Sequence, residues 1–188
     1  MLEKLLLLDT KLFLFLNGLG SDKYDGLWLF ITKQTNWTPV FLIFLYLIYK
    51  KIGMRQTLFV LVFVALIVTL TDQFTNVVKY AVERLRPCSN PNINTIMRVV
   101  KSSDTFSFFS GHAANSMAVC MFLYKILKPY YKHTYLLFLW PLVFAYSRIY
   151  LGLHYPLDIL CGYLFGLLSG YIVYRFYKLA QAKYFPIL

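Results

Sequence analysis

The sequence is poor in charge and in cysteine. Only 14% of its 188 residues are charged, and hydrophobic residues make up 59%, against about 45–50% in a typical soluble protein. A soluble domain of this length cannot bury that much apolar surface, which excludes a cytosolic globular enzyme. Cys88, Cys120 and Cys161 form no C-x-x-C pair, so the sequence predicts neither a zinc site nor a disulfide framework. Lipid is therefore the expected surroundings of most of the chain.

The few charges are strongly unbalanced. Nineteen Lys and Arg residues against eight Asp and Glu residues give a net charge of +11. In a soluble protein this excess would favour nucleic acid as the partner. Here no basic tract is long enough to follow a phosphate backbone, and the cations stand between apolar segments. We therefore expect no nucleic-acid partner; the predicted partners are the bilayer and a phosphorylated lipid.

The apolar segments predict an all-α, polytopic membrane helix bundle with about five transmembrane helices. The predicted spans are residues 24–49, 58–80, 110 to 125–132, 134–150 and 156 to 175–183. Residues 1–17 are too polar and too short to cross the bilayer and predict an amphipathic helix lying in the interface. We expect one integral membrane domain over residues 1–188, with an interfacial helix at 1–20 and a catalytic helix bundle at 24–180.

Three clusters of polar residues carry the chemistry, and all are predicted on the same membrane side. They are Lys79 with Arg86-Pro87, Ser110-Gly111-His112, and Ser147-Arg148 with His154 and Asp158. Arginine offers a planar fork that matches phosphate oxygens, and lysine offers a point charge. Ser110 and Gly111 precede a predicted helix start, where free N–H groups favour an anion. The clusters therefore predict a phosphate-binding site.

Two histidines at such a site allow a nucleophile and a proton donor. One neutral imidazole attacks phosphorus, and the other, protonated, gives its proton to the leaving oxygen. Asp158 follows His154 by four residues and is placed to orient it. Three cations already meet the developing negative charge, and no set of residues has metal-ligand spacing. We therefore expect no metal and no cofactor.

These clusters resemble the signatures of the type 2 phosphatidic acid phosphatase superfamily, the membrane lipid phosphate phosphatases. The signatures are K-x6-R-P, P-S-G-H and S-R-x5-H-x3-D, and the first and third are complete here. In the second, Phe109 stands where the family has proline, which puts the stiffness of that loop in question but not its hydrogen-bond donors. The resemblance covers residues 24–180.

The resemblance also implies a role for each residue of the signatures. It implies that His154 is the nucleophile, that His112 is the acid and that Asp158 orients the nucleophile. The phosphate-binding residues that it implies are Lys79, Arg86, Ser110, Gly111 and Arg148. The expected protein is a metal-independent lipid phosphatase that works through a phospho-histidine intermediate.

Basic residues indicate the orientation in the membrane. Segments 50–57, 125–133 and the tail from residue 175 share one side and carry nine basic and no acidic residues; the other side carries ten basic residues and all eight acids. The raw count of cations is even, but several of the ten belong to the motifs. The positive-inside rule then puts the purely basic side in the cytoplasm. We expect a multi-pass protein of a bacterial cytoplasmic (inner) membrane whose active site faces the periplasm or outer leaflet.

The residues alone do not select the lipid. Family frequency favours undecaprenyl pyrophosphate, with phosphatidylglycerophosphate, phosphatidic acid and lipid A phosphate as alternatives, and the lipid tail is expected to enter sideways between spans. A lipid or anion carrier is a distant alternative, although carriers commonly have two related halves and none is visible here. Asp72, two helical turns before Lys79 on the same face, either tunes that lysine or satisfies neighbouring polar groups. The oligomeric state stays open.

Overall fold

The structure is a computed structural model that describes residues 2–185, and within them the chain forms helices and no strand. The all-α fold class predicted from the sequence is therefore confirmed. The elements, in chain order, are α1 (Leu2–Gly18), α2 (Asp22–Ile31), η1 (Gln34–Trp37), α3 (Thr38–Val82), η2 (Pro87–Ser89), α4 (Gly111–Leu127), η3 (Thr134–Phe138), α5 (Leu139–Tyr150) and α6 (Pro156–Tyr184).

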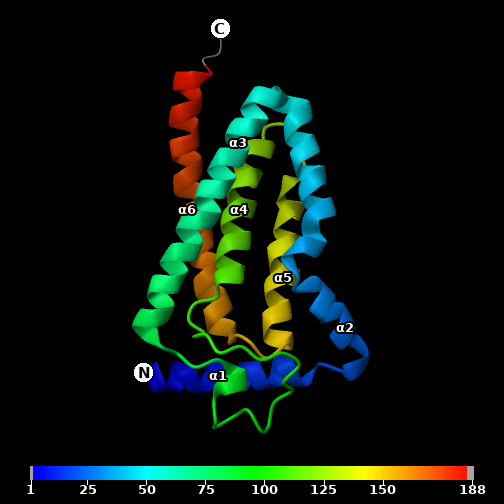
Figure 1. Cartoon of the computed structure of the whole chain (residues 1–188), viewed down its shortest axis with the longest axis vertical. Coiled ribbons are helices and arrows are strands. Elements are labelled where there is room, and N and C mark those ends of the chain that lie inside the picture. The colour runs from blue at the N-terminus through cyan, green and yellow to red at the C-terminus, as the bar shows by residue number, and fades with distance from the viewer. Residues whose placement is uncertain (1, 186–188) are drawn as a thin grey trace.

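Helix α3 is a hairpin of two arms rather than one rod. Gly53 interrupts its helical backbone with φ 74° and ψ 170°, a conformation that a residue without a Cβ adopts at little cost. The first arm rises along the bundle and the second descends beside it (Figure 1). The hairpin therefore returns the chain to the end of the bundle from which it started.

The first predicted span, residues 24–49, is not continuous. Helix α2 ends at Ile31, and the polar stretch from Lys33 to Asn36 passes through a 3-10 turn before α3 begins. The indole N–H of Trp37 donates to the carbonyl of Ile31 across this break (2.8 Å). By length and composition, two helical stretches, 34–89 and 156–184, can each cross a membrane. The count of five spans stays a prediction.

Helices α4 and α6 pack with almost no space between their backbones. Gly162, Gly166 and Gly170 recur every fourth residue on α6, so they share one face. A Cβ added at Gly162 would lie 2.7 Å from the carbonyl oxygen of Ser110, and one at Gly166 would lie 2.5 Å from that of Ala114. Glycine is needed there because no side chain fits, as in other close helix pairs in membranes.

Helix α1 lies across one end of the bundle, where the connections after α3 and α5 also gather (Figure 1). Asp9, Phe13 and Asn17 form its buried face, whereas Leu8 and Phe15 are 63% and 64% exposed. The amide of Asn17 donates to the carbonyl of Tyr150 (3.0 Å) at the end of α5. Helix α1 therefore covers one end of the bundle, and its position in the membrane interface stays a prediction.

The glycine face of α6 generates a stability prediction. Gly166→Ala would place its Cβ against the backbone of α4 and force the helices apart, so we expect the Tm in detergent to fall by about 5 °C or more. Gly26→Ala on α2 is the matched control, because nothing lies within 4 Å of its added Cβ and alanine is the better helix former. Equal Tm values for the two variants would contradict the close contact between α4 and α6.

Candidate active site

The three sequence clusters meet at the end of the bundle that α1 covers. The descending arm of α3, the start of α4, the end of α5 and the start of α6 all reach this end (Figure 1). A cavity of about 300 Å³ opens here. Four of the predicted site residues line it: Lys79, Arg86, Gly111 and His112.

His154 is not among the residues that line this cavity, but it contacts Arg86, which does. His154 is 1% exposed. Its Nδ1 lies 3.4 Å from Oδ2 of Asp158, and its Nε2 lies 3.3 Å from Nη1 of Arg86. Because a guanidinium donates and a carboxylate accepts, the network assigns the proton to Nδ1 and leaves a lone pair on Nε2. Burial lowers the pKa of His154 to about 3, although the hydrogen bond with Asp158 opposes the shift. The imidazole is therefore neutral at physiological pH.

Asp158 is held from several directions. Its Oδ2 accepts the backbone N–H of Tyr155 (2.9 Å) and the hydroxyl of Ser107, in addition to facing His154. Its Oδ1 accepts from Nη1 of Arg84 at 2.7 Å. Donors on both oxygens fix the plane of the carboxylate and with it the ring that it orients.

The two arginines of the signatures are buried in different ways. Arg86 donates from Nε and Nη2 to the carbonyl and hydroxyl oxygens of Thr105 (both 2.8 Å), and from Nη1 to the carbonyl of Leu153 (3.1 Å). Arg148 donates from Nη1 to the hydroxyl of Thr32 (2.6 Å). Its buried Nε has no acceptor among residues 2–185. Arg86 is thus held rigidly, and Arg148 keeps a donor to offer.

The start of α4 leaves two backbone donors for a ligand. Ser110 is the N-cap, and its hydroxyl accepts the N–H of Ala113 (3.4 Å). The N–H of Ser110 donates to the carbonyl of Asp158 (3.0 Å), and that of Ala114 closes the first helical turn. The N–H groups of Gly111 and His112 remain at the cavity, next to the positive end of the helix dipole.

The imidazole of His112 faces the cavity from the first turn of α4. Its ring packs against Phe144 with 5.4 Å between centroids. The charges of Lys79, Arg86 and Arg148 and the ring of His154 are near enough to act on it electrostatically. The structure therefore brings the two predicted histidines and the three predicted cations to one site.

Phe109, which replaces the family's proline, is packed rather than loose. It is 6% exposed and contacts Phe165 on α6 (5.1 Å between centroids) and Phe74 on α3 (6.5 Å). This aromatic contact anchors the loop before α4, so packing supplies the stiffness that a proline ring would otherwise supply.

Sequence reasoning missed several partners of the site. Arg84, Ser107 and Asp9 hold Asp158 directly or through each other, and Thr32 and Thr105 hold the arginines. A second arginine two residues before Arg86, and an aspartate in an otherwise Leu-rich helix, were signals that the sequence carried. Residues 2–185 bring no three His, Cys, Asp or Glu side chains together as metal ligands.

Comparison with known proteins gives relatives along nearly the whole chain. The family model of the PAP2 superfamily matches residues 57–182. A lipid A 4'-phosphatase of Bacteroides thetaiotaomicron is 35% identical to this chain, over 93% of this chain and 79% of the relative. A lipid A 4'-phosphatase of Porphyromonas gingivalis is 30% identical, over 97% of this chain and 78% of the relative. An undecaprenyl-diphosphatase of Sulfolobus acidocaldarius is 31% identical over 84% of this chain and 73% of that protein. Among solved structures, a transmembrane PAP2-type phosphatidylglycerolphosphate phosphatase of Bacillus subtilis shares the fold (TM-score 0.71, 20% identity, 98% of this chain and 90% of that one).

Burial of neutral His154 predicts how stability depends on pH. The pKa of His154 is about 3 in the folded chain and about 6.5 when unfolded, so below about pH 6.5 only the unfolded state takes up the proton. The corresponding stability is complete above that pH and declines toward pH 3. We expect the Tm in detergent to fall more steeply between about pH 7 and pH 4 for the native protein than for His154→Gln. Parallel curves would contradict a buried neutral imidazole.

Proposed function

The chain belongs to the PAP2 superfamily and is a lipid phosphatase, and we propose that it removes the 4'-phosphate of a lipid A-type glycolipid through a phospho-histidine intermediate. The single observation that carries the mechanism is the pairing of His154 with Asp158 on one ring nitrogen and with Arg86 on the other. It presents a neutral, oriented nitrogen lone pair beside a cation that attracts phosphate oxygens.

In the first step, Nε2 of His154 attacks phosphorus and the bond from phosphorus to the lipid oxygen breaks. His112, protonated, gives its proton to that oxygen, so the lipid leaves as an alcohol. In the second step, water attacks the phospho-histidine, His112 takes a proton from it, and inorganic phosphate leaves. Both histidines are then as they began.

Fixed donors stabilise the charge that develops on the equatorial oxygens. The side chains of Lys79, Arg86 and Arg148 and the N–H groups of Gly111 and His112 would supply them, while Ser110 fixes the start of α4. Because these groups fill the role that a divalent ion plays in other phosphatases, the proposed reaction uses neither metal nor cofactor.

The lining of the cavity bears on the choice of lipid. Besides the phosphate-binding side chains it contains Gln34, Asp72, Asn115 and Ser116. Asp72 precedes Lys79 by seven residues, and so lies about 10 Å deeper in the bundle at 1.5 Å per residue. A sugar headgroup offers hydroxyl and amide partners at that depth, whereas a polyprenyl chain begins directly after its diphosphate. Asp72 already accepts one hydrogen bond, from the amide of Asn76 (3.3 Å). Its remaining lone pairs are available to sugar hydroxyl groups, which favours the sugar.

The relatives point the same way. Two lipid A 4'-phosphatases match over more than nine-tenths of this chain. Undecaprenyl pyrophosphate, the lipid favoured from the sequence, has support from one relative that matches less of the chain. It is the second candidate, and phosphatidylglycerophosphate and phosphatidic acid are the remaining ones.

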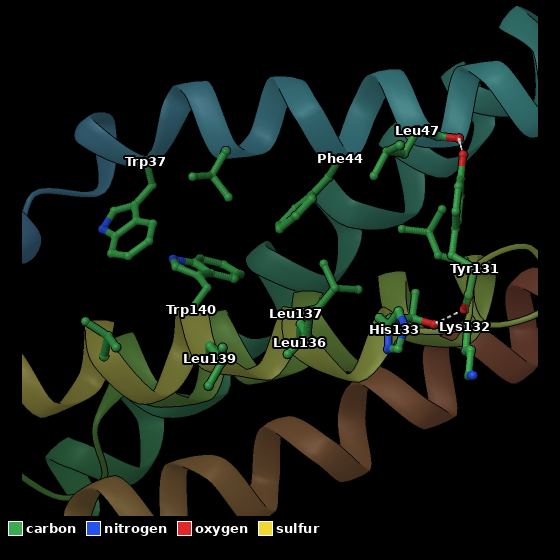
Figure 2. A pocket seen from close by; sticks show the side chains of 14 residues that line it. Trp37, Phe44, Leu47, Tyr131, Lys132, His133, Leu136, Leu137, Leu139 and Trp140 are labelled. Atoms are coloured by element: carbon green, nitrogen blue, oxygen red, sulfur yellow. Dashed lines mark hydrogen bonds between the residues drawn. The ribbon is translucent and has the colours of Figure 1, made fainter.

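An apolar groove beside the catalytic cavity suits an acyl chain. It has a volume of about 540 Å³ and runs between the first arm of α3 and the η3–α5 segment (Figure 2). Trp37 and Phe44 on one side of the groove face Leu137 on the other (Figure 2). Trp140 borders both the groove and the catalytic cavity. A lipid whose phosphate sits at His112 could therefore lay a chain along the bundle and enter from the side.

The distribution of basic residues bears on the orientation of the protein in the membrane. The nine basic residues of segments 50–57, 125–133 and 175–183 lie at the hairpin turn of α3 and at the ends of α4 and α6, opposite the catalytic end (Figure 1). This separation supports a bacterial inner-membrane protein with its basic end in the cytoplasm and its active site at the periplasmic or outer-leaflet side.

A lipid panel tests the activity. We expect purified protein in detergent to release phosphate from lipid A more efficiently than from undecaprenyl pyrophosphate, phosphatidylglycerophosphate or phosphatidic acid, and to do so in excess EDTA. His154→Ala should abolish release without loss of folding, whereas the control His133→Ala, at the opposite end, should keep it. No release from any lipid would favour a carrier, and loss in EDTA that magnesium restores would overturn the metal-free mechanism.

The polar lining generates a specificity prediction. Asp72→Asn keeps the size of the side chain but removes the charge that accepts sugar hydroxyl groups. We expect kcat/KM for lipid A to fall about 10- to 150-fold, the cost of one charge-assisted hydrogen bond, and kcat/KM for undecaprenyl pyrophosphate to change less than about 2-fold. Equal losses on both lipids would mean that Asp72 tunes Lys79 instead.

A further inference from the structure

Arg84 forms a bridge between two buried carboxylates. Its Nη1 lies 2.7 Å from Oδ1 of Asp158, and its Nη2 lies 2.6 Å from Oδ2 of Asp9 on α1. Both carboxylate side chains are at most 1% exposed, and the arginine side chain is 17% exposed. We propose that Arg84 and Asp9 are a positioning pair for the nucleophile His154, so that α1 is a working part of the catalytic site as well as an interfacial helix. This inference rests on the proposed role of His154.

Arg84 acts through Asp158 and not on the substrate. It is absent from the lining of the catalytic cavity, and both ends of its fork are taken by carboxylates. Its guanidinium also stacks 3.9 Å from the ring centroid of Tyr155, the residue next to His154. A planar fork with a stacked face fixes orientation in a way that a lysine ammonium cannot. Arg84 therefore holds the carboxylate that holds the imidazole.

Asp9 ties this arrangement to α1 and to α6 together. While Oδ2 binds Arg84, its Oδ1 accepts the backbone N–H of Leu157 (2.8 Å) in the first turn of α6. The Asp9 carboxylate thus accepts from an N–H at the start of α6 that has no partner within its own helix, and it also balances the charge of Arg84. Phe13, one turn further along α1, packs edge-on against Tyr155 (5.4 Å between centroids). The segment from His154 to Asp158 is thereby clamped from α1.

The sequence of alternating charges explains why Arg84 and Asp9 are needed to orient Asp158 and His154. Asp9, Arg84 and Asp158 alternate in sign, so each buried charge has a partner. Without Arg84, two carboxylates would remain buried near one another, and Asp158 would lose the only donor on its Oδ1 among the described residues. The carboxylate could then turn, and the Nδ1 proton of His154 would lose its fixed acceptor. A nucleophile misplaced by about 1 Å costs about 100-fold in rate.

Arg98 provides a second arginine bridge as a control, with the difference that its partner Asp22 has a side chain that is 98% exposed. Arg98 also bridges two aspartates, Asp22 (2.6 Å) and Asp25 (3.0 Å), and lies over a tyrosine ring, that of Tyr150 (5.7 Å). It ties the loop before α4 to α2 and contacts no residue of the catalytic set. A substitution at Arg98 removes an arginine bridge away from the site, and a substitution at Arg84 removes the bridge to Asp158, so the two variants can be compared.

The test compares kcat and KM for phosphate release from the best lipid of the panel. We expect Arg84→Gln to lower kcat about 100-fold and to leave KM within about 3-fold, and Arg98→Gln to leave both within about 3-fold. Arg84→Lys should give an intermediate kcat with the same KM, because one ammonium reaches only one carboxylate. Equal kcat values for Arg84→Gln and Arg98→Gln would overturn the inference, as would a loss in KM alone.

A double-mutant cycle tests the part of Asp9. Asp9→Asn keeps an acceptor for Leu157 but removes the charge that holds Arg84, so we expect kcat to fall about 10-fold, and the double variant with Arg84→Gln to be no slower than Arg84→Gln alone. Losses that multiply would show that Asp9 does not act through Arg84.

If Arg84→Gln does not fold, Arg84→Lys against Arg98→Lys provides the same comparison. A native protein that releases no phosphate would refute the proposed function, whereas an active native protein with an equally active Arg84→Gln would refute only the positioning pair.

Discussion

The close contact between α4 and α6 is the constraint on which the site depends. Three glycines on α6 allow its backbone to touch that of α4, and the N–H of Ser110 joins the two helix starts through the carbonyl of Asp158. The N-termini of both helices thus lie side by side. One brings His112 and two free backbone donors, and the other brings Asp158 and the residues just before it. The proximity of the proposed nucleophile, His154, to the proposed acid, His112, is a consequence of how these two helices pack.

A second constraint is the cost of charge in lipid. Most buried charges near the site have partners among the described residues. Arg84 lies between two carboxylates, and Arg86 is held by oxygens of Thr105 and Leu153. Lys79 and Arg148 keep donors for a ligand. In the proposed mechanism these remaining donors bind the phosphate in place of a metal ion.

Much of the site could be predicted from the sequence, because the signatures fix residue types and spacing near helix ends. The meeting of His112, His154 and the three cations follows from that spacing once the spans are antiparallel. Arg84 and Asp9 could not be paired, because 75 residues separate them and local patterns carry no information on such contacts. The break at 32–37 was missed because an apolar segment was counted as one span despite its polar run. The sequence also showed glycines at every fourth position of α6, but not which helix they face.

The substrate could not be chosen from the sequence, since the motifs predict a phosphate-binding site and say nothing of the group that carries the phosphate. Lining residues from α3, α4 and η1 come together only in the folded chain.

In the proposed mechanism His154 becomes phosphorylated. The direct measurement is to mix the protein with lipid A carrying a radiolabelled 4'-phosphate, quench in alkali within one turnover, and locate the label by peptide mapping. The account predicts an acid-labile, alkali-stable phosphate on His154. Label on His112, or turnover without any labelled protein, would contradict it.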